Sequence, residues 1–201
     1  YWRDIYMNGF ERLKEHKKAA IKMAVKELTS RKGIESLSMK AIAKTAGVSQ
    51  VTIYNHFKSK NELIKDVSRS LMEELYNAYF GILNSNHSFM EKLELILNER
   101  IRAVFDGSWN MLISAAEWDY EIDQMLKTGP LLKLKSRIYD LIEQGKDEGI
   151  VKNSIETNTI MQYLEMFRNW FDIGLDQAAN EKKAKDLLEL FIYGIRGNIK
   201  N

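Results

Sequence analysis

The amino-acid sequence predicts an all-α protein, and three observations support this. The 201 residues include a single proline and eleven scattered glycines, so few positions interrupt regular structure. Apolar residues recur at intervals of three and four, and the alternation typical of strands is scarce. With 45% hydrophobic residues the chain can bury a core, which argues against global disorder. Its length suits one large domain or two small ones.

Composition excludes several classes of protein. The absence of cysteine excludes disulfides, thiolate zinc sites and cysteine nucleophiles. The three histidines lie far apart, and the sequence contains neither a glycine-rich phosphate loop nor a serine nucleophile motif. We therefore expect no metal, no cofactor and no enzymatic activity. No apolar run approaches the roughly 18–20 residues of a membrane span, and no signal peptide is recognisable, so we expect a cytoplasmic protein without a membrane partner. Met7 is the natural start that we expect, with residues 1–6 either native or added.

Charge is unevenly distributed along the chain. Residues 1–65 hold 14 Lys and Arg against 6 Asp and Glu, whereas residues 66–201 hold 16 against 22. The net charges are therefore +8 and −6, which agree with the total of +2. Such asymmetry indicates an N-terminal part that binds nucleic acid and a second part with another role.

The first helix and the segment after it carry the strongest pattern. Apolar residues at i, i+3, i+4 and i+7 predict a helix from about residue 12 to residue 30, ending before Gly33. Two short helices are expected from about Ser38 to Phe57, with Gly47 taking the left-handed conformation that ends the first of them. Ser49 is a good N-cap for the second. This is the geometry of a helix-turn-helix, whose second helix lies in the major groove of DNA.

Further start and stop signals predict the remaining helices. Capping boxes at Ser59–Glu62 and Ser88–Glu91 open two helices, and Pro130 suits the first turn of another. The expected helices cover residues 59–83, 88–105, 109–127, 130–148, 154–179 and 181–198.

The segment from Lys17 to Val67 closely resembles the DNA-binding domain of the TetR/AcrR family of bacterial transcriptional regulators. The matching residues are Ala19-Ala20-Ile21, Gly33, Ile42-Ala43, Ala46-Gly47-Val48-Ser49, Ile53-Tyr54-Asn55-His56-Phe57, Lys58-Ser59-Lys60 and Leu63. The resemblance implies about nine helices and a homodimer. It also implies a DNA-binding domain over residues 1–63 and a helical effector-binding and dimerisation domain over residues 64–201.

Candidate DNA contacts lie in and around the helix-turn-helix. Gln50 can pair with adenine, Thr52 can contact a phosphate or a thymine methyl, and the Tyr54 hydroxyl can reach a phosphate. The resemblance implies backbone contacts for Tyr54, His56, Lys58 and especially Lys60. The full set of candidates is Ser38, Lys40, Ser49, Gln50, Thr52, Tyr54, His56, Lys58 and Lys60.

The second part of the chain offers candidates for an effector pocket and a dimer interface. Aromatic side chains and methionines are common in pockets for apolar or amphipathic ligands, although packing in a core is their more frequent role. The pocket candidates are Phe105, Trp109, Trp118, Tyr139, Tyr163, Phe167 and Trp170. The interface candidates, on the last two expected helices, are Met166, Ile173, Leu187, Leu190, Phe191 and Gly194.

Three functions fit these patterns. The leading one is a dimeric repressor that binds double-stranded operator DNA and is released by a small effector. The second is a structural nucleoid protein of the same fold that is regulated by a protein partner. The third is a helical enzyme with an incidental N-terminal domain, for which we found no supporting motif.

Overall fold

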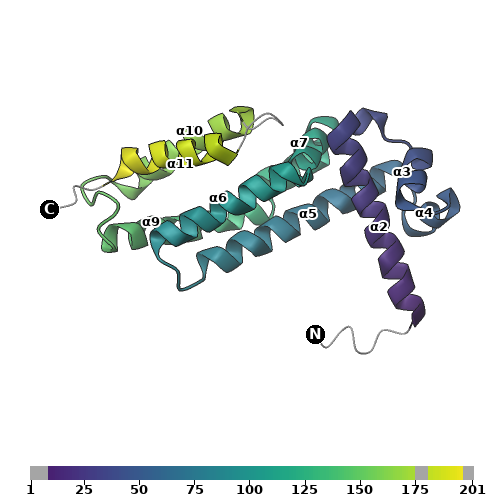
Figure 1. Cartoon of the computed structure of the whole chain (residues 1–201), viewed down its shortest axis with the longest axis horizontal. Coiled ribbons are helices and arrows are strands. Elements are labelled where there is room, and N and C mark those ends of the chain that lie inside the picture. Colours follow the sequence, from purple (N-terminus) through teal and green to yellow (C-terminus); the bar gives the residue numbers. More distant parts are fainter. Residues whose placement is uncertain (1–8, 175–180, 197–201) are drawn as a thin grey trace. The chain divides into compact units, whose positions relative to one another are not determined.

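The computed structural model describes residues 9–174 and 181–196, except for the side chains of residues 10, 131, 167–174, 181, 183–185 and 187. The predicted all-α class is confirmed: the described residues form helices and turns, with one isolated antiparallel bridge between Val151 and Arg196 (Figure 1). Contacts divide the chain into two compact units. The first comprises the residues up to Met72 together with Gly107–Leu126, and the second comprises Glu73–Asp106 together with the residues from Lys127 onward.

The first unit is built around a long N-terminal helix. The helix α2 packs against α3, α4 and α7, and the side chains of Ile21, Ile42 and Ile53 are fully buried. The elements of this unit are α2 (Gly9–Lys32), the 3₁₀ helix η1 (Ile34–Ser36), α3 (Met39–Ala46), α4 (Gln50–His56), the first half of α5 (Lys60–Leu83), α7 (Ser108–Trp118) and most of α8 (Tyr120–Thr128).

Residues 107–126, which we expected in the C-terminal domain, pack with the N-terminal helices. Gly107 shows how closely α7 approaches α2, because a Cβ at this position would lie 2.8 Å from the Cβ of Ser30. Gly107 also has a φ of 78°, which L-residues with side chains rarely adopt. Any other residue here would combine backbone strain with a steric clash.

The helix that we expected over residues 109–127 is interrupted at Asp119. This residue is extended, with φ −136° and ψ 120°. Its carboxylate accepts hydrogen bonds from the backbone N–H of Glu121 at 2.9 Å and of Ile122 at 3.4 Å, so Asp119 acts as the N-cap of α8. The chain therefore turns at Asp119, and we call this break the corner between α7 and α8.

The second unit packs α6 against α9 and α11, and α10 against α9. Its first helical turns differ from expectation: Pro130 opens a 3₁₀ helix and not an α-helix, and the helix expected from residue 154 begins at Thr157. The expected end of that helix near residue 179 lies outside the described residues. The elements are the second half of α5, α6 (Phe89–Phe105), η2 (Pro130–Leu134), α9 (Lys135–Asp147), α10 (Thr157–Gly174) and α11 (Glu181–Ile195).

Phe89 lies at the centre of the second unit's core. Its ring is fully buried, and the backbone of Gly145 in α9 lies so close that a Cβ there would come within 2.7 Å of the ring and of Val151. In the same core the rings of Tyr163 and Phe191 stack with their centres 5.5 Å apart, which joins α10 to α11.

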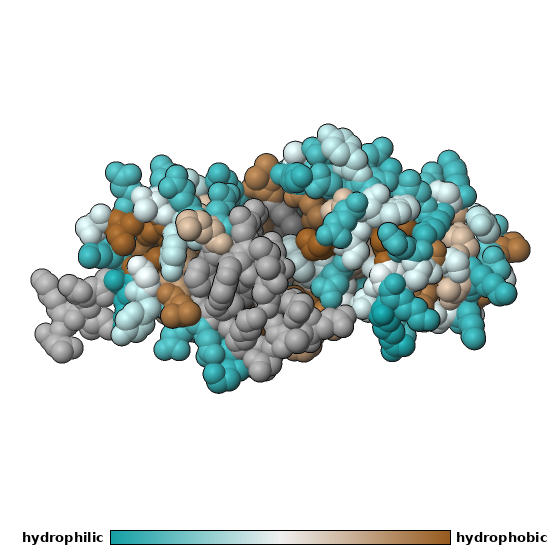
Figure 2. Space-filling model, turned by 90° about the horizontal axis from the view of Figure 1, so that it is seen from above, coloured by the Kyte–Doolittle hydropathy of each residue, from teal (hydrophilic) through white to brown (hydrophobic). Residues whose placement is uncertain are grey.

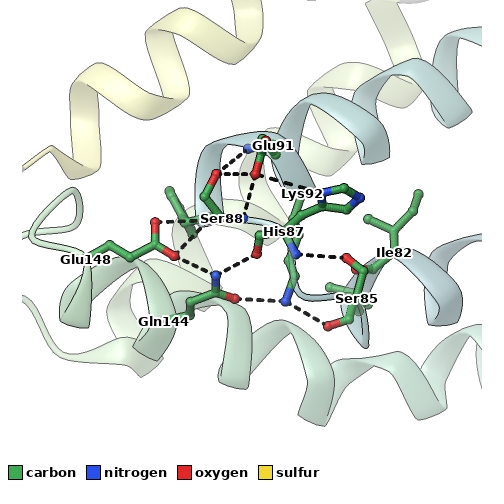
Figure 3. A network of polar contacts seen from close by, with 10 residues as sticks. Ile82, Ser85, His87, Ser88, Glu91, Lys92, Gln144 and Glu148 are labelled. Carbon is green, nitrogen blue, oxygen red and sulfur yellow. Dashed lines mark hydrogen bonds and ion pairs between the residues drawn. The ribbon is translucent and has the colours of Figure 1, made fainter.

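A polar network ties the turn between α5 and α6 to α9 (Figure 3). The ammonium group of Lys92, a residue that is only 6% exposed, donates to the Leu83 carbonyl at 3.1 Å and to Gln144 Oε1 at 2.9 Å. Gln144 in turn donates to the His87 carbonyl at 2.9 Å. The Glu148 carboxylate accepts from the Phe89 backbone N–H at 3.0 Å. This network satisfies backbone groups that the ends of the two helices leave unpaired.

The predicted capping box at the start of α6 is present. The Ser88 hydroxyl accepts from the Glu91 backbone N–H, and the Glu91 carboxylate accepts from the Ser88 backbone N–H at 2.8 Å. The Ser88 hydroxyl also donates to the Glu91 carboxylate at 2.7 Å, and this bond, followed by the one from the Ser88 backbone N–H, lowers the pKa of Glu91.

Polar residues predominate on the face of the molecule seen in Figure 2, where apolar residues show in small groups. Of the helices in the described ranges, none has the length and apolar character needed to cross a membrane.

Candidate nucleic-acid interface

The turn between α3 and α4 has the geometry that the sequence predicted. Gly47 is left-handed, with φ 66° and ψ 30°, and ends α3. The Ser38 hydroxyl accepts from the Ala41 backbone N–H at 3.1 Å and caps α3. The Ser49 hydroxyl accepts from the Thr52 backbone N–H at 3.0 Å and caps α4. Both helix starts and the turn between them are therefore fixed by local hydrogen bonds.

The helix α4 presents one face to the core and the other to solvent. Ile53 and Phe57 are buried. Val51 is 68% exposed and Tyr54 is 52% exposed, and Gln50 is exposed as well. Thr52 is half-buried, with its hydroxyl 2.9 Å from that of Ser49. The outward face thus offers an amide, a phenol and apolar surface, which suit contacts to base edges and phosphates.

The candidate cations differ in their surroundings. Lys40 and Lys58 are exposed at the starts of α3 and α5. Lys60, in the first turn of α5, is half-buried, and its ammonium lies 5.7 Å from the centre of the Trp118 ring. Its charge is therefore held beside an aromatic face while it remains at the start of the helix.

The N-terminal half of α2 adds positive charge beside the end of α4. Burial and the charges of Lys14 and Lys18 lower the pKa of His56, with Glu15 acting in the opposite direction and Lys17 adding to the effect. The lowered pKa favours the neutral form of His56 in the unbound protein. Lys14 was missed by the sequence analysis, since only the fold brings it near α4.

Part of the positive charge of α2 is neutralised within the first unit. The carboxylate of Asp66 in α5 lies 2.8 Å from the Lys22 ammonium and 3.8 Å from that of Lys18. Lys18 thus has a carboxylate partner. More than 40 residues separate the two sides of this contact, so no local signal in the sequence predicts it.

The pocket candidates do not all fall in one unit. Trp109 and Trp118 belong to the first unit, whereas Phe105, Tyr139 and Tyr163 belong to the second. Phe105 is 66% exposed. The Tyr139 hydroxyl donates to Asn158. The remaining two candidates, Phe167 and Trp170, have side chains outside the described residues.

The interface candidates also divide into two groups. Met166 and Leu190 are exposed, by 72% and 61% respectively, whereas Phe191 is buried in the unit's own core. A Cβ at Gly194 would lie 2.8 Å from the Tyr163 hydroxyl, so at this glycine α11 closely approaches a side chain of its own chain. The side chains of Ile173 and Leu187 lie outside the described residues.

In the described part of the chain, no three His, Asp or Glu side chains gather in an arrangement that could hold a metal ion. The first unit thus contains a helix-turn-helix, in which α4 exposes hydrogen-bonding groups and apolar surface and has cations nearby.

Comparison with known proteins agrees with this class. The family model described as "Bacterial regulatory proteins, tetR family" matches residues 23–67. The uncharacterised HTH-type transcriptional regulator YvdT of Bacillus subtilis is 33% identical over 79 residues, which are 39% of this chain and 41% of that protein. The HTH-type transcriptional repressor KstR2 of Mycolicibacterium smegmatis is 34% identical over 62 residues, 31% of this chain and 30% of the relative. These matches therefore span less than half the length of either relative.

Solved structures extend the likeness in fold to most of the chain. The ketosteroid transcriptional regulator KstR2 of Mycobacterium tuberculosis superposes with a TM-score of 0.63 at 15% identity, covering 90% of this chain and 95% of the other. The TetR family regulator PfmR of Thermus thermophilus gives 0.66 at 16% identity, covering 90% and 99%. Residues 23–67 thus match the tetR family of bacterial regulatory proteins, and the chain shares the fold of these solved structures.

Proposed function

We propose that this protein is a sequence-specific DNA-binding transcriptional regulator that reads an operator with the exposed face of α4. The observation that carries the proposal is the division of this helix, with Ile53 buried against the core while Gln50, Val51 and Tyr54 face solvent. A helix held by one face and capped at its start can enter the major groove as a rigid body. The chromosome of a bacterium lies in the cytoplasm, so the regulator acts there.

In this proposal the nine candidate residues divide by task. Gln50, Thr52 and Tyr54 face base edges or nearby phosphates. Phosphates at the rim of the groove are bound by the other members of the set: Ser38, Lys40, Ser49, His56, Lys58 and Lys60. The basic N-terminal half of α2 adds a longer-range attraction, since charge near the groove strengthens binding to any sequence.

We further propose that the regulator is a homodimer joined through α10 and α11. Large apolar side chains at Met166, Leu190 and Tyr193 are exposed on these helices, where a partner can cover them. A two-fold dimer presents two copies of α4 to successive major grooves, so the operator should be a near-palindrome.

The regulator we propose is a repressor released by a small apolar or amphipathic effector bound in the second unit. The aromatic residues and methionines of that unit, and the match of residues 23–67 to the tetR family, support this reading. An effector can release DNA only by favouring one arrangement of the protein over another, with a coupling of typically about 1–3 kcal/mol.

Selection of bound duplexes from a random-sequence pool, followed by gel shifts over a series of salt concentrations, tests DNA binding. Lys60→Ala should weaken binding to all duplexes alike and reduce the slope of log affinity against log salt by about 0.9. Gln50→Ala should instead change the preferred sequence. Lys133→Ala, an exposed lysine of the second unit, serves as the matched control and should leave binding unchanged.

The outcomes separate the alternatives. Binding that is indifferent to salt would contradict the electrostatic part of the proposal, and an equal loss on all sequences for Gln50→Ala would remove its reading role. Sequence-independent binding by the unaltered protein would favour a structural nucleoid role. A gel shift repeated with apolar and amphipathic compounds tests the effector, and sedimentation at micromolar concentration tests the dimer.

A further inference from the structure

The corner between α7 and α8 lies against the start of α5, within the first unit. Trp118, the last residue of α7, is 39% exposed, and its ring centre is 5.7 Å from the Lys60 ammonium. A cation over the face of an indole ring is attracted by the negative charge of the π-system. The ring therefore restricts where this lysine, which has many rotamers, can place its charge.

Lys60 needs such a partner because of its place in α5. It occupies the first position of the helix, where the partial positive charge of the helix dipole repels a cation. Without the ring, the flexible side chain would be driven outward from the helix start. The face of Trp118 offsets this repulsion and keeps the ammonium beside the first turn.

Three polar contacts hold the corner in place. The Asp119 carboxylate lies 3.5 Å from the Lys65 ammonium, and it also accepts a hydrogen bond from the Asn61 side chain. Lys65 forms a second ion pair with Glu121. Because Asn61 and Lys65 lie on successive turns of α5, these contacts fix the corner in both position and rotation. Trp118, one residue before Asp119, is fixed with it.

We propose that Trp118 is a positioning residue for DNA binding, which holds the Lys60 ammonium at the start of α5 so that it meets a backbone phosphate. The inference rests on the proposed function, since it assigns a support to one of its phosphate contacts. A lysine held in one place loses less conformational freedom on binding than a free one, and the affinity gains by that difference. Trp118 itself touches no DNA in this arrangement.

A double-mutant cycle tests the assignment. Binding to one fixed duplex of arbitrary sequence is measured over a series of potassium chloride concentrations for the unaltered protein, Trp118→Leu, Lys60→Ala and the double variant. We expect Trp118→Leu to weaken binding several-fold and to lower the salt slope toward that of Lys60→Ala, a reduction of up to about 0.9. In the Lys60→Ala background it should have no further effect, because the residue it acts through is gone.

Two further variants separate positioning from packing. Trp118→Phe keeps an aromatic face and should retain most of the affinity and the salt slope. Tyr120→Leu changes an exposed aromatic residue of the same corner and should leave both unchanged. Thermal melting of every variant shows whether the fold is intact.

The results distinguish the inference from the proposal beneath it. An equal loss from Trp118→Leu with and without Lys60, or an unchanged salt slope, would overturn the positioning role while leaving DNA binding intact. A failure of the unaltered protein to bind this duplex even at low salt, together with a failure to select any duplex from the random-sequence pool, would overturn both.

Discussion

In the first unit the turn that matters for recognition is fixed by hydrogen bonds spanning three residues, at Ser38 and Ser49. In the second unit the corresponding turn, between α5 and α6, is also fixed by bonds that span more than fifty residues, from Lys92 to Gln144 and from Phe89 to Glu148. The hydrogen bonds of a turn of the first kind need only residues that are close along the chain. A turn of the second kind forms only once a distant helix is in place. The two units therefore respond differently to substitution.

The largest loss of stability should come from substitutions in the core of the second unit, around Phe89. Phe89→Ala removes a fully buried ring and should lower the free energy of unfolding by about 3–5 kcal/mol. Phe105→Ala, at the other end of the same helix and largely exposed, should change it by less than about 0.5 kcal/mol. Urea denaturation followed by circular dichroism measures both. Similar losses for the two variants would mean that Phe105 is covered in solution.

The second largest loss of stability should come from disrupting the polar network around Lys92 in the second unit. Lys92→Met keeps the length of the side chain but leaves the Leu83 carbonyl and Gln144 Oε1 without their donor, which should cost about 1–3 kcal/mol. The exposed Lys133→Met provides the control and should be nearly neutral. A stability equal to that of the unaltered protein would show that the methionine's packing offsets the lost bonds, as happens for some buried ion pairs.

Gly47 in the first unit and Gly145 in the second are required for different reasons. Gly47 adopts a left-handed backbone conformation, whereas Gly145 leaves room for the side chains packed against it. At Gly47 an added Cβ meets nothing within 4 Å, so Gly47→Ala should cost about 1–2 kcal/mol through its left-handed φ alone. Gly145→Ala should cost about 1–3 kcal/mol through its clash with Phe89 and Val151.

Asparagine distinguishes these causes, since it tolerates the left-handed conformation but is larger than alanine. Gly47→Asn should recover most of the stability, whereas Gly145→Asn should lose more than Gly145→Ala. Thermal melts of the four variants decide the matter, and a reversed order at either site would refute the cause given for it.

The smallest effect is a pH dependence in the first unit. The folded-state pKa of His56 lies below its ordinary value near 6.5, chiefly through burial and then through Lys14 and Lys18. The unfolded chain therefore binds the proton more readily, and stability should decline as the pH falls through about 6.5. A phosphate beside His56 would raise its pKa in the complex, so DNA affinity should rise several-fold over the same range.

His56→Gln should abolish both trends, and His87→Gln in the second unit should abolish neither. Fluorescence anisotropy with labelled duplex at several pH values measures the affinity. A pH dependence that survives in His56→Gln would assign it to another group.

The contrast between local and distant contacts also explains which features could be predicted from the sequence. The turn at Gly47, the cap at Ser49 and the capping box at Ser88 depend on neighbours along the chain, and each was predicted and is present. The break at Asp119 was missed although this residue caps α8 locally, and its contacts with Lys65 and Asn61, which lie more than fifty residues earlier, are not apparent in the sequence. The buried Lys92 was missed for the same reason, since a lysine in a helix is ordinarily solvated.

For the candidate interface, residue types and helix register were enough to identify the outward face of α4. They did not show that Lys18 pairs with Asp66 or that Lys60 lies over Trp118. These partners determine how strongly each lysine can attract a DNA phosphate. They come from segments that are far apart in the sequence and meet only in the folded protein.

The burial of Lys92 has a consequence for its chemistry. An acylating reagent reaches an amine only when it is in contact with solvent, and the ammonium of Lys92 is enclosed by Leu83 and Gln144. Exposed amines such as that of Lys133 should be acylated rapidly, whereas Lys92 should be acylated only after the turn at residues 84–88 opens. The rate of acylation of Lys92, measured by mass spectrometry of its peptide, therefore reports how often this turn opens. The Lys92 side chain is thus a natural probe of local opening in the second unit, and it can be used in the unaltered protein.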